Sequence, residues 1–154
     1  MFRMTKLSDY AIMLLTYFAR EPQMQRSARD LSVQSHLPLP TVRKILKILV
    51  RGGLLDTHRG VKGGFVLTRL PEKVTMTDII AALEGPVAIT QCSGKDDRCR
   101  LEPSCPVRSN WRKINKVVYD ALRGITLSEM TQQLHVPIEF RRPALIPAGG
   151  HHVG

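Results

Sequence analysis

The chain has 154 residues, 43% of them hydrophobic, and a formal net charge of +10 at pH 7. A chain of this length forms one domain or one small domain with an appendage, and it has no run of about 18 apolar residues that would span a membrane. The apolar run from Ala11 to Ala19 follows Asp9 and lacks a cleavage site, so the N-terminus does not resemble a signal peptide and we expect a cytoplasmic protein with reduced thiols.

Positive charge is concentrated in the first half of the chain. Residues 1–70 hold 12 Lys and Arg against 4 Asp and Glu, a net charge of +8, whereas residues 71–154 hold 11 against 9, a net charge of +2. A polyanionic partner is therefore expected to bind the first half. A basic surface that binds nothing is the less favoured alternative on charge alone.

The first predicted helix begins with Ser8 as its cap and runs from Tyr10 to Ala19, before Pro22. It is apolar nearly all round, which predicts burial. Asp9 lies in its first turn, where an acidic side chain complements the helix N-terminus.

Two further helices follow, separated by a short turn. The segment Ser27–Asp30 resembles a capping box and predicts a short helix to about Ser35. The next helix is expected to have Pro40 at its first position and to end at Arg51, before two glycines. Its apolar residues have the spacing of one buried face and are Val42, Ile45, Leu46 and Leu49. The outer face is left with Thr41, Arg43, Lys44, Lys47 and Arg51.

This arrangement is the plan of a helix-turn-helix, whose second helix enters the major groove of DNA. A helical hairpin with a solvated basic face is the alternative. Two strand-like runs, 54–59 and 65–69, then flank a glycine-rich loop and predict a β-hairpin, which after a helix-turn-helix forms a wing. His58, Arg59 and Lys62 at its tip suit phosphate or minor-groove contacts. DNA binding is the favoured interpretation.

The second half predicts three more helices. One covers residues 79–84 and ends at Gly85, a long one runs from about Pro106 to Arg123, and a short one begins at Thr126. The long helix has an apolar stripe of Trp111, Ile114, Val117, Val118, Ala121 and Leu122. This stripe packs either on the protein's own core or against a second subunit, as a two-fold symmetric DNA reader requires. Residues 137–154 lack periodicity and are expected to form a mobile tail.

Three cysteines lie in a polar loop, with six and five residues between them. They are Cys92, Cys99 and Cys105, and no fourth cysteine exists in the chain. Zinc sites usually show paired C-x-x-C motifs, which are absent, whereas wide spacing suits a loop wrapped around an iron–sulfur cluster of two or four irons. Zinc binding and a metal-free thiol switch remain the alternatives. A cluster needs a fourth ligand, which we expect from a distant part of the chain, from another subunit or from a small molecule. Glu102 is closer in sequence, but it lies inside the loop, where a solvated acid is the alternative.

The chain resembles the Rrf-type winged-helix transcription regulators, the family of IscR and the nitric-oxide sensor NsrR. The likeness covers roughly residues 1–133 and rests on segments 5–11, 58–64 and 78–85 together with the three cysteines. Segments 37–42, 84–86 and 104–111 are most similar to the branch that regulates the SUF operon for iron–sulfur assembly.

The resemblance implies a homodimer whose long helices cross, with a cluster held by Cys92, Cys99 and Cys105. The histidine that IscR-like proteins use as fourth ligand is replaced by Arg108, whereas Asp9 matches an aspartate that NsrR-like proteins donate across the dimer. The base-reading positions fall on Pro38, Pro40 and Arg43. Of these three, only Arg43 has a side chain that can donate hydrogen bonds, and it is suited to guanine. In the wing, Arg59 matches an arginine that reaches the minor groove.

The sequence thus predicts a mainly α fold with a small β wing: a winged helix-turn-helix domain plus a long dimerisation helix. We expect the DNA-binding domain in 1–85, the cysteine loop in 86–105, the dimerisation and terminal helices in 106–136, and the tail in 137–154. The expected metal ligands are Cys92, Cys99, Cys105 and Asp9. The expected dimer contacts are Trp111, Ile114, Val118 and Leu122. The expected contacts to DNA are Ser27, Pro38, Pro40, Thr41, Arg43, Lys44, Lys47, Arg51, His58, Arg59 and Lys62.

The predicted function is a DNA-binding regulator, a repressor of SUF genes, that senses through its own iron–sulfur cluster. A nitric-oxide-responsive regulator of the same fold and a zinc- or thiol-based redox regulator are the alternatives. An electron carrier is disfavoured, because electron transfer needs neither a wing nor a basic half. The expected partners are an operator in double-stranded DNA and a second copy of the chain, with no membrane and no small-molecule substrate. No catalytic residue set is present, so we do not expect an enzyme.

Overall fold

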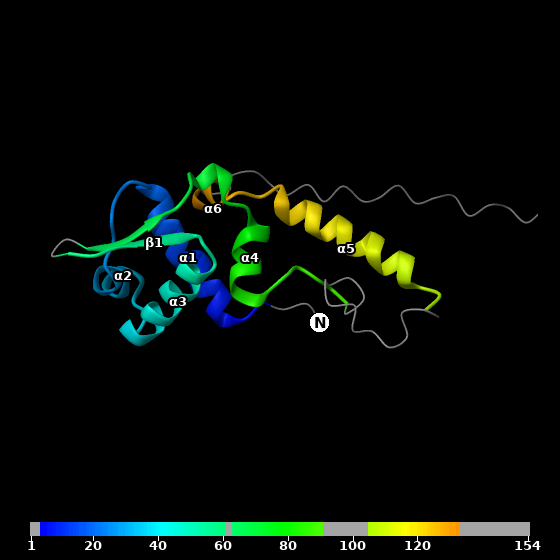
Figure 1. The fold of residues 1–154 in the computed structure, drawn as a ribbon, viewed down its shortest axis with the longest axis horizontal. Helices are drawn as coiled ribbons and strands as arrows, with labels where there is room; N and C mark the ends of the chain where they lie inside the picture. The colour runs from blue at the N-terminus through cyan, green and yellow to red at the C-terminus, as the bar shows by residue number, and fades with distance from the viewer. Residues whose placement is uncertain (1–3, 61–62, 91–104, 133–154) are drawn as a thin grey trace, which may run out of the picture.

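The computed structural model describes residues 4–60, 63–90 and 105–132, and it has a mainly helical fold with one two-stranded hairpin (Figure 1). In chain order the elements are α1 (Lys6–Arg20), α2 (Ala28–Ser35), α3 (Leu39–Arg51), β1 (Leu55–His58), β2 (Gly64–Leu67), the 3-10 helix η1 (Pro71–Lys73), α4 (Met76–Glu84), α5 (Arg108–Arg123) and α6 (Leu127–Thr131). The predicted fold class is confirmed. No helix in these ranges has the length and apolar character needed to cross a bilayer.

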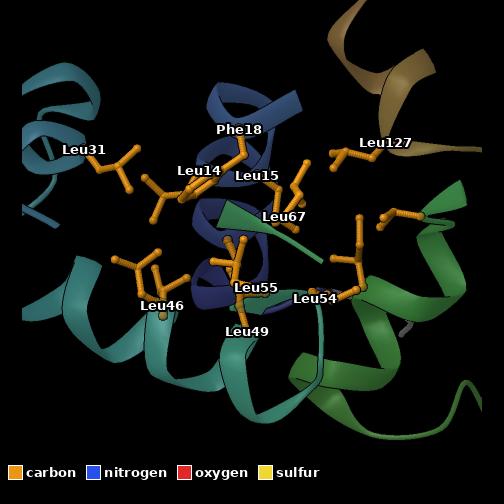
Figure 2. Packing of buried hydrophobic residues seen from close by; sticks show 14 of the residues in the cluster. Leu14, Leu15, Phe18, Leu31, Leu46, Leu49, Leu54, Leu55, Leu67 and Leu127 are labelled. Carbon is orange, nitrogen blue, oxygen red and sulfur yellow. The ribbon is translucent and has the colours of Figure 1, made fainter. Parts of the chain in front are cut away.

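A single apolar core joins the helix-turn-helix, the wing and the last helix. Figure 2 shows side chains of α1, α2, α3, the hairpin and α6 converging on it. The four residues predicted to form the buried face of α3 are all fully buried. Leu127 of α6 is fully buried as well, although more than a hundred residues of chain separate it from α1. Burying each such side chain stabilises the fold by roughly 1.5–3 kcal/mol.

The start of α1 differs from the predicted one. Thr5, not Ser8, is the N-terminal cap, and its hydroxyl accepts a hydrogen bond from the Ser8 backbone N–H at 3.2 Å. Ser8 lies inside the helix and is buried. The helix is buried along one face, with half-buried residues beside it, and is not buried all round. Thr5 is the cap because its backbone is extended and because a distant carboxylate, described below, binds both hydroxyls.

The turn between α2 and α3 has one strained residue. The predicted cap of α2 is confirmed, since the Ser27 hydroxyl accepts the Asp30 backbone N–H at 3.1 Å. His36 ends α2 with φ of 57°, in the left-handed region, and it is the only non-glycine residue there among those described. The next helix starts at Leu39, one residue earlier than expected, so Pro40 occupies its second position. The first helical turn tolerates proline because its N–H groups have no intrahelical partner.

The wing is an antiparallel hairpin that is tied to the helix-turn-helix by backbone hydrogen bonds. Thr57 pairs with Phe65, and Leu55 pairs with Leu67 in the core. Beyond the hairpin, the Arg26 N–H donates to the Phe65 carbonyl at 3.0 Å and the Phe65 N–H donates to the Arg26 carbonyl at 2.9 Å. The wing therefore begins in the core and is fixed to the segment between α1 and α2.

The last helices close the core from the other side. α4 starts with a capping box between Thr75 and Asp78 and ends at Gly85, whose φ of 91° favours glycine. After α5, the chain returns: the Leu127 N–H donates to the Val74 carbonyl at 2.8 Å. Figure 1 shows α5 extending away from the core between these points. The predicted tail, Lys62 and two of the three cysteines, Cys92 and Cys99, lie outside the described residues.

Replacing His36 by Gly is expected to raise the free energy of unfolding by about 1 kcal/mol. The left-handed conformation costs roughly 1–2 kcal/mol for a residue with a β-carbon, and the greater chain entropy of glycine offsets part of the gain. His36→Val should be destabilising, because β-branched residues tolerate positive φ least, while His36→Asn should resemble the wild type. Urea unfolding measures all three, and a His36→Gly variant less stable than His36→Val would contradict this conformation.

Candidate nucleic-acid interface and sensor elements

The outer face of α3 is a row of cations. Arg43, Lys44, Lys47 and Arg51 are exposed, and Thr41 is half-buried. α3 contains no acidic residue, so none of these cations has a carboxylate one turn away. None of the four forms an ion pair with a carboxylate in the described part of the chain. Their full positive charge is available to a polyanion.

The other predicted DNA contacts differ in their exposure and in whether their side chains already form hydrogen bonds. Pro38 and Pro40 are exposed at the start of α3, and His58 and Arg59 are exposed at the tip of the wing. Ser27 is half-buried and already engaged, because its hydroxyl caps α2 and donates to the Asp30 carboxylate at 2.7 Å. All of these assignments remain predictions.

A hollow of about 400 Å³ lies between α3 and the wing, a feature that the sequence did not indicate. It is lined by Arg43, Lys47, Val50, Arg51, Thr57 and Phe65. Three of these residues are cations of α3, whereas Thr57 and Phe65 are cross-strand partners of the wing. The hydrophobic alternation of the strands could have indicated that these two side chains share a face, but not which helix they face.

The predicted oxygen ligand, Asp9, is exposed in the first turn of α1. Its backbone N–H donates to the Thr5 carbonyl, and its carboxylate has no hydrogen bond or ion pair with any residue that the structure describes. Cys105, just before α5, is a free and half-buried thiol. Figure 1 shows the start of α5 well separated from the start of α1, so one chain does not bring these two residues together.

The end of α4 is bound to the start of α1 through one carboxylate oxygen. Glu84 Oε1 accepts hydrogen bonds from the Thr5 hydroxyl at 2.7 Å, the Ser8 hydroxyl at 2.5 Å and the Thr5 backbone N–H at 3.3 Å. The C-terminal end of a helix disfavours an acid, but Glu84 also lies at the positive N-terminal end of α1. The hydroxyl of Ser8, followed by that of Thr5, lowers the pKa of Glu84. This link joins the helix that holds Asp9 to the chain segment that leads into the cysteine loop.

The predicted dimerisation helix α5 buries none of its residues within one chain. Trp111 is 37% exposed, Ile114 45% and Val117 63%. Val118 is half-buried, and Leu122, at the end nearest the core, packs against the core cluster. The apolar stripe therefore has an exposed part, which includes Trp111, Ile114 and Val117, and a short part at Leu122 that packs against the core.

The fold and the basic face together define a winged helix-turn-helix DNA-binding protein. A family model described as Rrf2, iron-dependent transcriptional regulator, matches residues 4–133. The chain belongs to this Rrf2 family and is an HTH-type transcriptional regulator, not an enzyme.

Relatives with known names support this membership. The HTH-type transcriptional repressor NsrR of Streptomyces coelicolor is 28% identical over 83% of this chain and 87% of its own. A putative HTH-type regulator, BadM of Rhodopseudomonas palustris, is 31% identical over 79% of this chain and 74% of its own.

Two solved structures share the fold. IscR of T. potens has a TM-score of 0.62 at 25% identity, covering 84% of this chain and 85% of its own. CymR, the global cysteine regulator of B. subtilis, has a TM-score of 0.66 at 23% identity, covering 85% of this chain and 97% of its own. The second likeness concerns the fold alone.

Replacing Glu84 by Gln is expected to reduce stability at neutral pH. Because the pKa of Glu84 is lowered in the folded protein, its ionised form contributes stability above the usual glutamate pKa of about 4.3. That contribution is lost as the pH falls through the lowered pKa. The difference in melting temperature between wild type and Glu84→Gln should therefore shrink below about pH 4.3. Thermal melts between pH 7 and pH 3 measure it. Glu72→Gln, at an exposed site, is the control, and a Glu84→Gln difference that is the same at every pH would contradict the prediction.

Proposed function

We propose that this chain is a homodimeric repressor of the SUF iron–sulfur assembly genes, which senses its signal through an iron–sulfur cluster of its own. The cluster would be held by Cys92, Cys99, Cys105 and Asp9 of the partner subunit. The three thiols need a reducing compartment, which agrees with a cytoplasmic location. The choice of SUF genes rests on the sequence segments 37–42, 84–86 and 104–111 and on membership of a family described as iron-dependent.

The observation that carries the sensor part of the proposal is the exposed carboxylate of Asp9, which has no hydrogen bond or ion pair with any described residue. An exposed acid that no described residue engages has an oxygen available to a metal, and a half-buried free thiol suits a soft ligand. The separation of α1 and the start of α5 in one chain favours a ligand donated from a second chain (Figure 1). The donor set of thiolates and one oxygen therefore fits a labile cluster.

The exposed part of α5 supports the dimer. An apolar stripe that is free along most of a helix loses contact with water when a second copy packs against it. Two-fold pairing would place two copies of α3 so that they reach half-sites about 34 Å apart, one turn of DNA.

The proposed switch acts through the residues that connect the loop to the DNA-binding elements. An iron–sulfur cluster supplies ligation that oxidants, nitric oxide or loss of iron can change. Release of Asp9 would free the first turn of α1, which Glu84 joins to the end of α4. A small movement of these helices alters the separation of the two copies of α3 and hence the fit to both half-sites.

A second candidate is a nitric-oxide-responsive regulator of the same fold. It is favoured by the similarity to the repressor NsrR over most of both chains. The resemblance described from the sequence, in which Asp9 matches an aspartate ligand, favours it as well. The two candidates differ in the genes that they control, so binding to SUF promoter DNA distinguishes them.

Anaerobic purification followed by absorbance spectroscopy and assays of iron, sulfide and zinc tests the cluster. We expect a coloured protein with iron and sulfide, and a colourless protein with one zinc per chain would overturn the proposal in favour of a zinc regulator. Asp9→Ala should shorten the lifetime of the cluster in air, because an oxygen ligand is removed. Glu72→Ala, which changes another exposed acid, should leave that lifetime unchanged. A wild-type lifetime in Asp9→Ala would exclude Asp9 as the ligand.

Ile114→Glu tests the dimer. A charge placed on the exposed stripe of α5 should convert the dimer to monomers, because two copies would bury a carboxylate without a partner. Lys113→Glu changes the charge on the exposed neighbouring residue outside the stripe and should stay dimeric. Analytical ultracentrifugation reports the mass, and an Ile114→Glu variant that remains a dimer would show that the interface lies elsewhere.

A further inference from the structure

The side chain of Asn115 joins α5 to the segment that follows α4. The Ile89 backbone N–H donates to Asn115 Oδ1 at 3.0 Å, a contact between residues 26 positions apart in the chain. Both residues are half-buried, whereas most residues of α5 are exposed. Because the donor is a backbone N–H, the acceptor must be the oxygen of the amide and not its nitrogen.

The segment after α4 is held by side chains and not by backbone pairing. Residues 86–90 form no backbone-to-backbone hydrogen bond with any residue that the structure describes. Pro86 has no N–H to donate, and α4 has already ended at Gly85. A covered N–H without a partner is destabilising, so the Asn115 oxygen satisfies the Ile89 N–H and at the same time fixes the path of the chain.

The same helix holds the far end of the cysteine loop. The backbone N–H of Arg108, the first residue of α5, donates to the Cys105 carbonyl at 3.3 Å. Arg108 and Asn115 are seven positions apart, which is two helical turns, so they lie on one side of α5 and about 10 Å apart along its axis. Cys105 precedes Arg108 by three residues. At the other end of the loop, Cys92 follows Ile89 by three residues. Both ends of the loop are therefore tied to one helix.

We infer that Asn115 is a positioning residue for the proposed cluster ligands, because it holds the entry of the cysteine loop on α5 and narrows the range of separations open to Cys92 and Cys105. The inference rests on the proposed iron–sulfur cluster and adds to it a residue that acts through the loop. Bringing the ends of a loop together costs chain entropy. A loop whose two ends are already fixed loses less entropy when its thiolates converge on a cluster, so the bound cluster is more stable.

The position of Asn115 on α5 supports this role. It lies four residues after Trp111 and three before Val118, on the side of the apolar stripe. An amide in a surface that a second subunit covers is unfavourable unless it is hydrogen-bonded. Its oxygen has the Ile89 N–H, and pairing of two copies would exclude water from this bond and strengthen it. The proposed dimer contact and the entry of the cysteine loop therefore meet at one residue.

Asn115→Ala tests the inference, with Asn110→Ala as the matched control. Asn110 is exposed on the same helix, so its replacement makes the same chemical change away from Ile89. Hydrogen exchange followed by NMR in the metal-free protein should show the Ile89 amide exchanging about fivefold faster in Asn115→Ala than in wild type or Asn110→Ala. Asn115→Asp, which keeps an acceptor oxygen, should restore the slow exchange.

The second measurement is the lifetime in air of the cluster reconstituted in the full chain. Asn115→Ala should shorten it about fivefold, the ratio to which one net hydrogen bond corresponds, while Asn110→Ala keeps the wild-type lifetime. Thermal melts of the metal-free Asn115→Ala protein should stay close to those of wild type, because the higher helix propensity of alanine offsets part of the lost hydrogen bond.

Three results would contradict the inference. If Ile89 exchanges at the same rate in wild type and Asn115→Ala, the bond does not hold the loop. If exchange is faster but the cluster lifetime is unchanged, the bond does not position the ligands. If the lifetime falls only together with the thermal stability of the metal-free protein, Asn115 has a structural role alone. A wild-type protein without iron and sulfide would instead defeat the proposed function, and the inference with it.

Discussion

The junction at Arg26 is the constraint on which the arrangement of the DNA-binding elements depends. Its backbone forms two hydrogen bonds with Phe65 of the wing, and its guanidinium binds Glu21 at the end of α1 and Gln34 in α2. The side chain of Arg26 is only 8% exposed. A β-carbon on Gly64 would lie 2.9 Å from the Arg26 carbonyl oxygen, so this close approach requires glycine. One residue thus fixes the wing against two helices.

This junction holds the wing in a fixed position beside the basic face of α3. With the wing held, Thr57 and Phe65 line one hollow together with Arg43, Lys47 and Arg51 of α3. A cationic helix alone would bind a phosphate backbone in many registers, because charge carries little sequence information.

A second link, at Glu84, ties two helices of the same core together. It joins the start of α1, where Asp9 lies, to the end of α4, from which the chain continues toward the cysteines. The segment after α4 also contacts α5, since the Ile89 N–H donates to the Asn115 side chain at 3.0 Å. Of the two helices joined at Glu84, α1 packs on both α3 and the wing, and α4 packs on α3.

The sequence by itself determined the features that depend on near neighbours: the buried face of α3, the Ser27 cap of α2, the hairpin and the presence of an apolar stripe on α5. Helical periodicity and capping involve residues only three to seven positions apart, so they can be read directly. The cap of α1 was predicted wrongly because the choice between Ser8 and Thr5 depends on Glu84, 76 positions from Ser8. The hollow likewise required the tertiary structure, since the Arg26–Phe65 pairing decides which face of the wing meets α3.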